Sequence, residues 1–251
     1  MVKIASFNVN SVRARMPVVL EWLRQTRPDV VLLQETKCED QVFPMLELED
    51  AGYNVKIHGQ KSYNGVAILS RGYIDDVQRG LFDDHQARYI DAFTCGVRVV
   101  GIYAPNGNPI GTEKFQYKLA WMEKLHERLA ELGRQGEPLI VGGDFNVVRR
   151  DDMIYNARAF ADDAIMQPES RLGFEKILGL GLVSAAEKFG LEREYTYYGY
   201  RAGSRQKGNG IVLDYFLLND AAASMAKAYG VDGFARDLPR GSDHIPIWLE
   251  C

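Results

Sequence analysis

The sequence has little cysteine and no long apolar run. Only three of its 251 residues are cysteines, and no C-x-x-C pair occurs. This usage argues against a disulfide framework or a zinc cluster and favours a reducing compartment, so we expect a cytoplasmic protein. The first residues lack the apolar segment of a signal peptide. No stretch approaches the roughly 18 uncharged apolar residues of a membrane span, so no membrane partner is expected.

The sequence also lacks an excess of basic residues. Lys and Arg number 30, Asp and Glu number 34, and the formal net charge is −4. A nucleic acid would therefore have to be bound by a local basic face. Three enzyme motifs are absent as well: the G-x-x-x-x-G-K-[ST] of P-loop enzymes, the H-E-x-x-H of zinc hydrolases and the G-x-S-x-G of α/β-hydrolases. Their absence disfavours these three classes.

Short apolar runs alternate with amphipathic stretches along the whole chain. Hydrophobic residues make up 46% of the sequence, and no long Pro/Gly/Ser-rich linker divides it, so we expect one domain over residues 1–251. Apolar runs predict strands at residues 2–7, 29–34, 65–70, 97–103, 138–142, 213–218 and 245–249. Helical periodicity follows Ser11 and is longest over residues 112–133, whereas residues 150–175 are typical of a loop with short helices. This mixture predicts an α/β fold of layered sheets flanked by helices.

Polar side chains stand at the ends of several predicted strands or beside them. They are Asn8, Glu35, Asp144, Asn146, Asp214, Asp243 and His244. Carboxylates in such places need partners, because unpaired charges are rarely buried. Oxygen donors with water suit Mg²⁺ or Mn²⁺, and a His beside Asp suits acid–base work or phosphate stabilisation. Each residue alone is also explained as a cap or turn former, although Asp214 fits that explanation less well because it lies inside an apolar run.

Six segments occur in a characteristic order: S-F-N-V-N at 6–10, L-Q-E-T-K at 33–37, H-G-Q-K at 58–61 with G-V-A-I-L at 65–69, G-I-Y-A-P-N-G at 101–107, G-G-D-F-N at 142–146 and S-D-H at 242–244. Together they resemble the bacterial exonuclease III-type apurinic/apyrimidinic endonucleases of the endonuclease/exonuclease/phosphatase superfamily, over residues 2–249. The resemblance implies a deoxyribonuclease I-like, four-layer αββα sandwich of two packed mixed β-sheets flanked by helices, with the site at one end of the sheets.

The resemblance also implies a function. It indicates a Mg²⁺-dependent DNA-repair phosphodiesterase, with Mn²⁺ as a substitute ion, that cuts double-stranded DNA 5′ to abasic sites. A 3′–5′ exonuclease and trimming of blocked 3′ ends accompany this activity. The alternatives are a relative that hydrolyses RNA or inositol phosphates, a mainly exonucleolytic variant with weak abasic-site activity, and a non-catalytic DNA-binding module. No apolar stripe is left unassigned, so we expect a monomer.

Four residues are implied to form the metal side of the site. Glu35 would be the main Mg²⁺ carboxylate, and Asn8 and Asn10 would shape the metal and water shell beside it. Asp243 would support the same region.

Five residues are implied to carry the hydrolysis. Asp144 would orient or deprotonate the attacking water, and Asn146 would hold Asp144 and a phosphate oxygen. His244 would contact the scissile phosphate, with Asp214 orienting its imidazole, and Tyr103 would hydrogen-bond the phosphate or the leaving oxygen. A metal ion, a cationic His and a Tyr hydroxyl would neutralise the charge that develops at the phosphate.

A further set is implied to contact DNA: Arg13, Lys37, Lys61, Asn106, Tyr197, Tyr198, Arg201, Arg205 and Lys207. The basic members near 201–207 belong to a Gly-rich segment that is alternatively a solvated loop, and the tyrosines are alternatively strand-core residues. Two features of the sequence depart from the family pattern. Both 197 and 198 are Tyr where the family usually has a Trp, and Val212 replaces a usual Arg. We expect abasic-site incision to remain detectable despite these changes.

Overall fold

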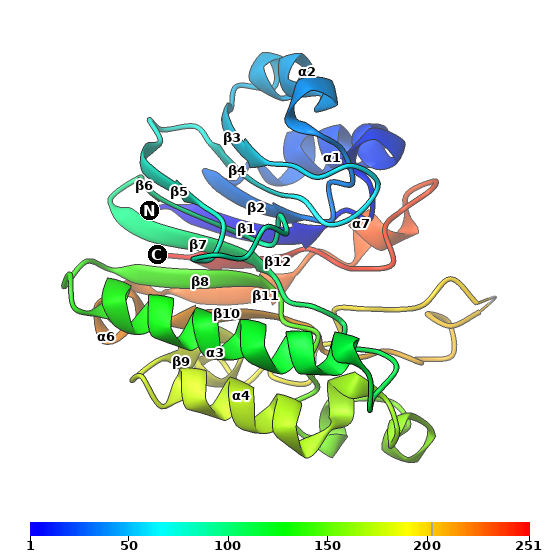
Figure 1. Ribbon diagram of the computed structural model, residues 1–251. Coiled ribbons are helices and arrows are strands. Elements are labelled where there is room, and N and C mark those ends of the chain that lie inside the picture. The colour runs from blue at the N-terminus through cyan, green and yellow to red at the C-terminus, as the bar shows by residue number, and fades with distance from the viewer. Residues whose placement is uncertain (202) are drawn as a thin grey trace.

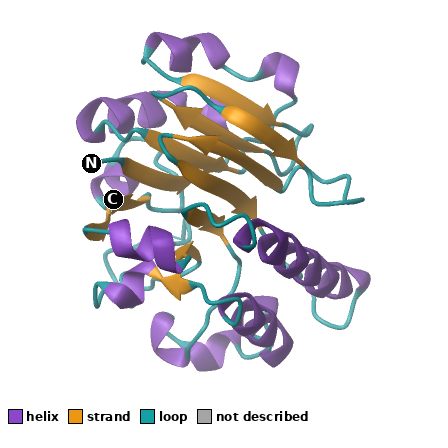
Figure 2. Ribbon diagram, turned by 90° about the vertical axis from the view of Figure 1, so that its left-hand side faces the viewer, coloured by secondary structure: helices purple, strands orange, loops and turns teal. Residues whose placement is uncertain are grey.

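The apolar runs of the sequence form two six-stranded β-sheets that pack face to face. This computed structural model describes residues 1–201 and 203–251, so residue 202 of the Gly-rich segment lies outside the described residues. Helices cover the outer face of each sheet, and the layers therefore run helix, sheet, sheet, helix (Figures 1 and 2). This arrangement confirms the αββα sandwich implied by the sequence.

Each sheet joins strands that are distant in the chain. In spatial order, the first sheet contains β11 (Ala228–Val231), β12 (Ile247–Glu250), β1 (Lys3–Asn8), β2 (Val30–Gln34), β4 (Val66–Ser70) and β3 (Asn54–His58). The second contains β5 (Asp75–Arg79), β6 (Tyr89–Thr94), β7 (Val97–Tyr103), β8 (Leu139–Asp144), β10 (Asp214–Leu218) and β9 (Val183–Ser184). Both sheets are mixed, since each pairs parallel and antiparallel neighbours.

The helices fall into longer and shorter groups. The longer ones are α1 (Val12–Thr26), α3 (Glu113–Gly133) and α4 (Pro168–Leu178). The shorter α-helices are α2 (Met45–Asp50), α5 (Ala185–Lys188), α6 (Asp220–Met225) and α7 (Phe234–Asp237), and the 3₁₀ turns are η1 (Asp40–Val42), η2 (Asp151–Met153), η3 (Ala157–Phe160) and η4 (Ala164–Met166). Among the described residues, no helix combines the length and the apolar character that a membrane crossing requires.

The central strand β2 is apolar at residues 30–33 because both of its faces are covered. In β2, Val30 and Leu32 face the core between the sheets, whereas Val31 and Leu33 face the helix layer. Successive side chains of a strand point to opposite faces, so a strand buried on both sides needs an unbroken apolar run. The apolar sequence of residues 30–33 is therefore explained by its position between two layers.

Amphipathic helices fix each outer layer to its sheet. Trp22 of α1 packs against Phe7 of the first sheet, with ring centroids 5.3 Å apart in an edge-on arrangement. Trp121 of α3 and Phe174 of α4 belong to the core on the outer face of the second sheet. Ser11 caps α1, since its side chain accepts a hydrogen bond from the Ala14 amide, as the sequence predicts.

Most predicted elements agree with the structure within one or two residues. The prediction for residues 97–103 coincides with β7, and that for 112–133 differs from α3 by one residue. Two predictions were wrong in part. Residues 150–175 contain the start of a regular helix, α4, with Pro168 at its first turn. Asp214 begins β10 instead of lying inside it, because residues 211–213 form only isolated bridges or loop.

Candidate active site

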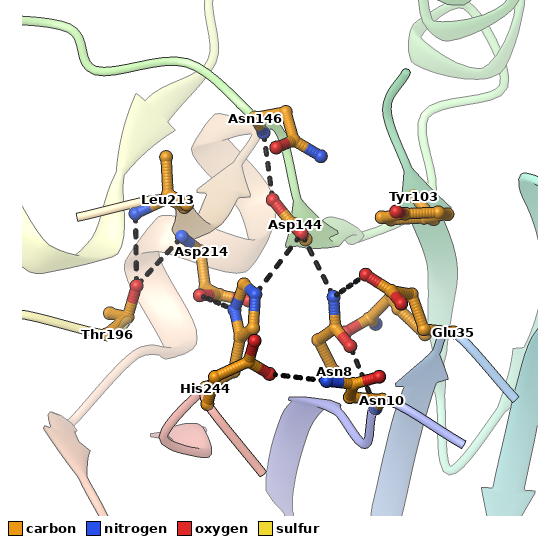
Figure 3. A network of polar contacts seen from close by, with 12 residues as sticks. Asn8, Asn10, Glu35, Tyr103, Asp144, Asn146, Thr196, Leu213, Asp214 and His244 are labelled. Carbon is orange, nitrogen blue, oxygen red and sulfur yellow. Dashed lines mark hydrogen bonds and ion pairs between the residues drawn. The ribbon is translucent and has the colours of Figure 1, made fainter. Parts of the chain in front are cut away.

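The strand topology brings distant segments to one edge of the two sheets. β1 and β2 are parallel neighbours, as are β7 and β8, so the carboxyl ends of all four strands lie at one end of the sandwich. β10 and β12 run antiparallel to β8 and β1 and contribute their amino ends. Such strand ends position side chains rigidly at a surface. The residues gathered at this end are Asn8, Glu35, Tyr103, Asp144, Asp214 and His244 (Figure 3).

Two glycines permit the close approach of β8 to its neighbours. A Cβ on Gly142 would lie 2.5 Å from the Phe216 ring. Gly143 has a φ of +153°, and a Cβ there would clash with the carbonyl oxygen of Ile102. The G-G before Asp144 is therefore a steric requirement of the strand that carries this carboxylate.

Asp144 is the centre of the hydrogen-bond network. Its side chain is almost fully buried, and its Oδ1 accepts a hydrogen bond of 2.9 Å from the backbone N–H of Asn146. Its Oδ2 accepts one of 3.0 Å from Asn8 Nδ2 and lies 3.6 Å from His244 Nε2. These contacts fix the orientation of the carboxylate from two sides (Figure 3).

His244 is held by a carboxylate on the other side of its ring. Its Nδ1 lies 2.8 Å from Asp214 Oδ2, and the backbone N–H of Asp214 donates a 3.1 Å hydrogen bond to Thr196 Oγ1. The Tyr197 ring packs edge-on against the imidazole, with centroids 5.0 Å apart. A His with one nitrogen on a buried carboxylate has a fixed orientation, which leaves the other nitrogen directed at Asp144.

The charges of this group shift the pKa values of its members. Burial by itself would lower the pKa of His244, but the carboxylates of Asp214 and Asp144 outweigh it and raise the pKa to about 10. His244 is therefore an imidazolium near neutral pH. Burial raises the pKa of the Asp144 carboxyl above its usual range, although the His244 charge opposes that effect. A carboxyl whose pKa is raised toward neutrality is suited to general-base chemistry.

Glu35 lies on the opposite side of Asn8 from Asp144. Its Oε1 accepts a 3.0 Å hydrogen bond from Asn8 Nδ2, and its Oε2 lies 2.6 Å from Lys37 Nζ. Lys37 also donates to Asn10 Oδ1 at 2.7 Å, and Asn10 Nδ2 donates to Asp243 Oδ1 at 3.0 Å. The residues expected on the metal side therefore lie in one connected network.

The backbone around this network adopts an uncommon conformation at several non-glycine residues. The residues with left-handed φ values are Asn10 at 44°, Ser11 at 86°, Glu35 at 53°, Lys37 at 53° and Asn146 at 49°. Each such conformation costs free energy, about 1 kcal/mol or more, and persists where the surrounding structure imposes it. Five such residues lie around this network. The backbone there adopts costly conformations that orient the side chains of the site.

The donors near Glu35 fit a hard divalent cation. Burial would raise the pKa of Glu35, but hydrogen bonds from Lys37 and Asn8 outweigh it and hold the pKa below the usual range. Glu35 is thus a carboxylate with a cation already beside it. Among the described residues, no group of three or more His, Cys, Asp or Glu side chains forms a preassembled metal cage. Such a set fits Mg²⁺, which often takes one or two carboxylates and completes its shell with water and substrate phosphate.

Asn8 connects the carboxylates of Glu35 and Asp144. Its Nδ2 donates to both Glu35 and Asp144, and its Oδ1 accepts a 3.1 Å hydrogen bond from the Asn10 backbone N–H. Its amide is therefore used to space the two carboxylates. In this arrangement Asn8 shapes the metal side by holding Glu35.

Two tyrosines border the carboxylates and keep their protons. Burial, together with the negative charges of Glu35 and Asp144, raises the pKa of Tyr103 well above its usual value, and the ring lies beside Glu35 (Figure 3). Burial and the charge of Asp243 raise the pKa of Tyr197 to about 12. Both hydroxyls can therefore donate hydrogen bonds to an anionic substrate at neutral pH.

Apart from Tyr197 and Tyr198, the residues expected to contact DNA fall into two groups. Those with exposed side chains are Arg13, Lys61, Asn106, Arg201 and Lys207. The described residues of the segment, 200–201 and 203–210, project from the body at the end of the sandwich opposite the two termini (Figure 1). These exposed cations are available to phosphates without breaking an internal contact.

The second group is already engaged within the protein. Arg205 pairs with Asp237 at 2.8 Å, donates to the Gly233 carbonyl at 2.9 Å and lies over the Tyr198 ring. Lys37 is paired with Glu35. These two cations stabilise the walls of the site, and a phosphate contact would require them to share or exchange a partner.

Packing explains why position 212, which departs from the family pattern, is a Val. Val212 is 3% exposed and belongs to the core on the outer face of the second sheet, where its N–H donates to the Met153 carbonyl at 2.9 Å. A small apolar side chain suits this position, because a charged one would need a partner in the core.

Three residues of the site were not expected from the sequence. Thr196 supports the start of β10, and Ser242 Oγ donates to the Asn8 carbonyl at 2.7 Å. Lys118 is fully buried and donates to the carbonyls of Asn106 and Asn146. Two of the three had a sequence signal: Ser242 belongs to the S-D-H segment, and Lys118 interrupts an apolar helical stripe between Phe115 and Met122.

Comparison with known proteins gives a consistent result. The sequence model of the Endonuclease/Exonuclease/phosphatase family matches residues 5–244. Exodeoxyribonuclease III of Haemophilus influenzae is 29% identical over 264 aligned positions, which cover 99% of this chain and 99% of that protein.

Two solved structures share the whole fold. The 3′ phosphatase NExo from Neisseria, bound to a product DNA hairpin, superposes with a TM-score of 0.96 and 35% identity, covering 100% of this chain and 99% of that one. An AP endonuclease from Archaeoglobus fulgidus superposes with a TM-score of 0.95 and 35% identity, covering 99% of this chain and 98% of that one. The similarity therefore includes the strand ends that carry the site.

Proposed function

The chain belongs to the endonuclease/exonuclease/phosphatase family and, within it, to the exonuclease III type, and from this premise we propose that it is a Mg²⁺-dependent DNA-repair phosphodiesterase. It cuts double-stranded DNA 5′ to abasic sites, removes nucleotides from 3′ ends and trims blocked 3′ ends. The observation that carries the proposal is the convergence of Asp144, His244 and Glu35, which are remote in sequence, around the single amide of Asn8 and its neighbours.

All three activities break the same kind of bond, between phosphorus and a 3′ oxygen. In each case water adds to a phosphorus atom, and the bond between that phosphorus and the 3′ oxygen of the preceding nucleotide breaks. A single catalytic arrangement therefore serves internal incision, exonuclease action and removal of a 3′ phosphate. The substrates differ in what lies on the other side of the phosphorus.

Asp144 is the residue that prepares the water. Its carboxylate is buried and held by Asn8 and by the backbone of Asn146, and its raised pKa allows it to accept a proton at neutral pH. The proton lost by the water goes to Asp144, while the leaving 3′ oxygen takes a proton from solvent and can accept a hydrogen bond from Tyr103.

His244 and Tyr103 stabilise the charge that develops on the phosphate. Because Asp214 and Asp144 keep His244 protonated, its Nε2 can donate a hydrogen bond to a phosphate oxygen. Tyr103 is a neutral donor on the other side of Asp144. Preorganised donors of this kind act mainly by stabilising the transition state.

Mg²⁺, when bound, supplies a Lewis acid that offsets charge on the phosphate and the leaving oxygen. Glu35 is the carboxylate that would hold it, with Asn8 and Asn10 arranging the water around it and Asp243 supporting Asn10. Lys37 would have to move from Glu35 Oε2 or share that oxygen. Mn²⁺ is the expected substitute, since it prefers the same oxygen donors.

The partner and the setting follow from the same proposal. The substrate is duplex DNA, held by the exposed cations Arg13, Lys61, Arg201 and Lys207 around the site, despite the net charge of −4. Phosphate contacts of this kind set position and register without reading sequence. We propose that the protein acts as a monomer in the cytoplasm.

A second candidate is a mainly 3′-directed enzyme with weak abasic-site incision. Two observations favour it: the Neisseria neighbour is named a 3′ phosphatase, and Tyr occupies both 197 and 198. Tyr197 lies against the imidazole of His244, so the residue at this position shapes the space next to the scissile phosphate.

The two candidates are separated by a panel of labelled duplexes incubated with Mg²⁺. One duplex carries a single abasic site, one a recessed 3′ end and one a 3′ phosphate, and inositol phosphates serve as the control for another branch of the superfamily. The proposal predicts incision 5′ to the abasic site as well as 3′ processing. Processing of the 3′ ends alone would establish the second candidate, and phosphate release from inositol phosphates alone would refute both.

A further inference from the structure

Lys118 occupies a position where a charged side chain is costly. It lies in the first half of α3, its side chain is fully buried, and its neighbours on the same helix face are Phe115 and Met122. A lysine almost never lies wholly inside a protein without a partner, because its ammonium loses the solvation of water. The hydrolysis proposed above assigns no step to this residue.

The ammonium of Lys118 connects the two loops that follow β7 and β8. Its Nζ donates a 3.1 Å hydrogen bond to the carbonyl oxygen of Asn106 and a second, short one to the carbonyl oxygen of Asn146. Gly107, which has a φ of +90°, makes room for the aliphatic part, since a Cβ there would lie 2.7 Å from Lys118 Cδ. The loop is therefore shaped around this side chain.

The carbonyl of Asn146 belongs to the residue that supports Asp144. Asn146 has a left-handed φ of 49°, and its N–H donates the 2.9 Å hydrogen bond to Asp144 Oδ1. Its side-chain Nδ2 donates to the Ala104 carbonyl at 2.9 Å. Fixing the carbonyl of Asn146 thus fixes the peptide orientation on which the Asp144 contact depends.

No carboxylate compensates the charge of Lys118. Among the described residues, none lies within ion-pair distance of its Nζ, and burial lowers its pKa to about 7 although Asp144 and Asp163 oppose the shift. A hydrophobic side chain would fill the same space in the core without this cost. The amine is therefore explained by its two carbonyl contacts and not by packing.

We propose that Lys118 is a positioning residue that clamps the β7 and β8 loops together, fixes the left-handed peptide at Asn146 and thereby aligns Asp144. The consequence for catalysis rests on the proposed hydrolytic function. The anchoring of Asn146 is independent of that function and can be measured separately.

The test compares Lys118→Met, which keeps the length and loses the donor, with Lys124→Met. Lys124 lies on the same helix and pairs with Asp83 at the surface, so this control removes an equal charge. Amide hydrogen exchange at Asn146 is measured in both variants. Single-turnover cleavage of an abasic duplex and the equilibrium affinity for that duplex are measured alongside it.

We expect exchange at Asn146 to become at least tenfold faster in Lys118→Met and to stay unchanged in Lys124→Met. The cleavage rate constant should fall about 100-fold, as expected when a catalytic group is misaligned by about an ångström, while DNA affinity changes less than threefold. Unchanged exchange at Asn146 would overturn the anchoring. Faster exchange with a wild-type cleavage rate would overturn its link to Asp144.

Failure of the proposed function would look different, because wild-type protein would then leave every DNA substrate intact while the exchange result still decided the role of Lys118. Should Lys118→Met not fold, Lys118→Gln replaces it, since its amide is shorter and cannot reach both carbonyls. The same tenfold increase in exchange at Asn146 is expected, and protection equal to wild type would refute the proposal.

Discussion

The opposite charges of Asp144 and His244, 3.6 Å apart, limit what each residue can do. Asp214 keeps the imidazole protonated from the far side, so His244 cannot act as the base for the water. Among the described carboxylates of the site, Asp214 Oδ2 contacts the imidazole and Glu35 Oε2 contacts Lys37, so the proposed mechanism assigns this task to Asp144. These contacts are the reason for proposing Asp144 as the base and His244 as the cation.

Asp144→Asn tests the base directly. The substitution keeps the shape of the side chain and removes its ability to take a proton, so turnover should fall by about 1000-fold or more, near the upper range for loss of a general base. DNA affinity should stay roughly unchanged, because Asp144 is not among the residues proposed to hold the DNA backbone. Rapid-quench cleavage and fluorescence anisotropy measure the two quantities, and near-wild-type turnover would remove Asp144 from this role.

The pKa of His244 predicts a pH-dependent effect of Asp214→Asn. The folded-state pKa of about 10 is higher than the unfolded value of about 6.5. Folding therefore favours the protonated form. This contribution to the free energy of unfolding is fully present below about pH 6.5 and is lost as the pH rises toward 10.

Asp214→Asn removes the largest cause that raises this pKa. We expect the variant to be less stable than wild type by about 2 kcal/mol near pH 6, with a difference that narrows as the pH rises toward 10. The alkaline limb of its cleavage profile should move to lower pH. Urea unfolding and cleavage rates across pH 5.5–10 measure both effects, and a stability difference that grows with pH would have the wrong sign for this account.

Glu35→Gln tests the metal side. The change preserves the hydrogen bond from Asn8 but removes the negative charge that would hold Mg²⁺, so the Mg²⁺ concentration for half-maximal cleavage should rise about 10–100-fold. Glu49→Gln on α2 is the matched control, since Glu49 is exposed and lies outside the network. An unchanged Mg²⁺ titration in Glu35→Gln would exclude this residue as a ligand.

At the scale of elements, the Gly-rich segment after Tyr200 is the one proposed to contact a DNA partner. Tyr200 secures its beginning, since the Tyr200 hydroxyl accepts a 2.9 Å hydrogen bond from Arg15 and lies 3.3 Å from the Gly241 carbonyl. Arg205 secures its return through Asp237. Tyr200 and Arg205 thus attach the segment to the body, and Lys207, which follows Arg205 in the chain, is exposed.

Lys207→Ala should weaken DNA binding and reduce its salt dependence. Loss of one phosphate contact lowers the slope of log K against log salt by roughly 0.9. Arg205→Ala should change the slope less, because its guanidinium already pairs with Asp237. Lys227→Ala, an exposed lysine beside the far end of the first sheet, is the control, and a slope identical to wild type in Lys207→Ala would place this lysine outside the interface.

The central strands other than β6 were predictable from sequence, whereas β6 and the edge strands were not. β2, β7 and β8 are apolar on both faces, so their composition alone identifies them. The edge strand β5 has the sequence D-D-V-Q-R with mostly exposed side chains, and β9 has only two residues. A strand that is hydrogen-bonded on one side and solvated on the other leaves little mark in the sequence.

The same distinction holds within the site. Glu35 and Asp144 were predictable because each follows an apolar strand. The pairing of Lys37 with Glu35 and the support of Asp214 by Thr196 were not. These contacts depend on left-handed backbone turns and on chain segments that meet only in the tertiary structure.

At the scale of the whole molecule, the site lies at the end where the carboxyl ends of the central strands of both sheets come together. Its walls are the ends of strands whose apolar residues form the core between the sheets and the cores beneath the helices. These cores consist of apolar side chains, and the described residues form no group of three or more His, Cys, Asp or Glu side chains that could hold a metal ion. Metal binding and folding are therefore expected to be weakly coupled.

Removal of divalent ions should abolish cleavage without unfolding the protein. We expect an excess of chelator to lower the midpoint of thermal unfolding by less than about 2 °C. Circular dichroism melts with Mg²⁺ and with chelator measure the shift. A fall of tens of degrees would show that the ion is structural and would contradict the expected weak coupling between metal binding and folding.

The central claim is that these strand ends form a metal-dependent site for breaking the DNA backbone next to an abasic residue. The most direct measurement is single-turnover incision of a duplex with one abasic site, with Mg²⁺ and with chelator, using wild type and Asp144→Asn. The account predicts a nick 5′ to the abasic site that requires both Mg²⁺ and Asp144. An intact duplex with wild type in Mg²⁺, or equal nicking by the variant, would contradict it.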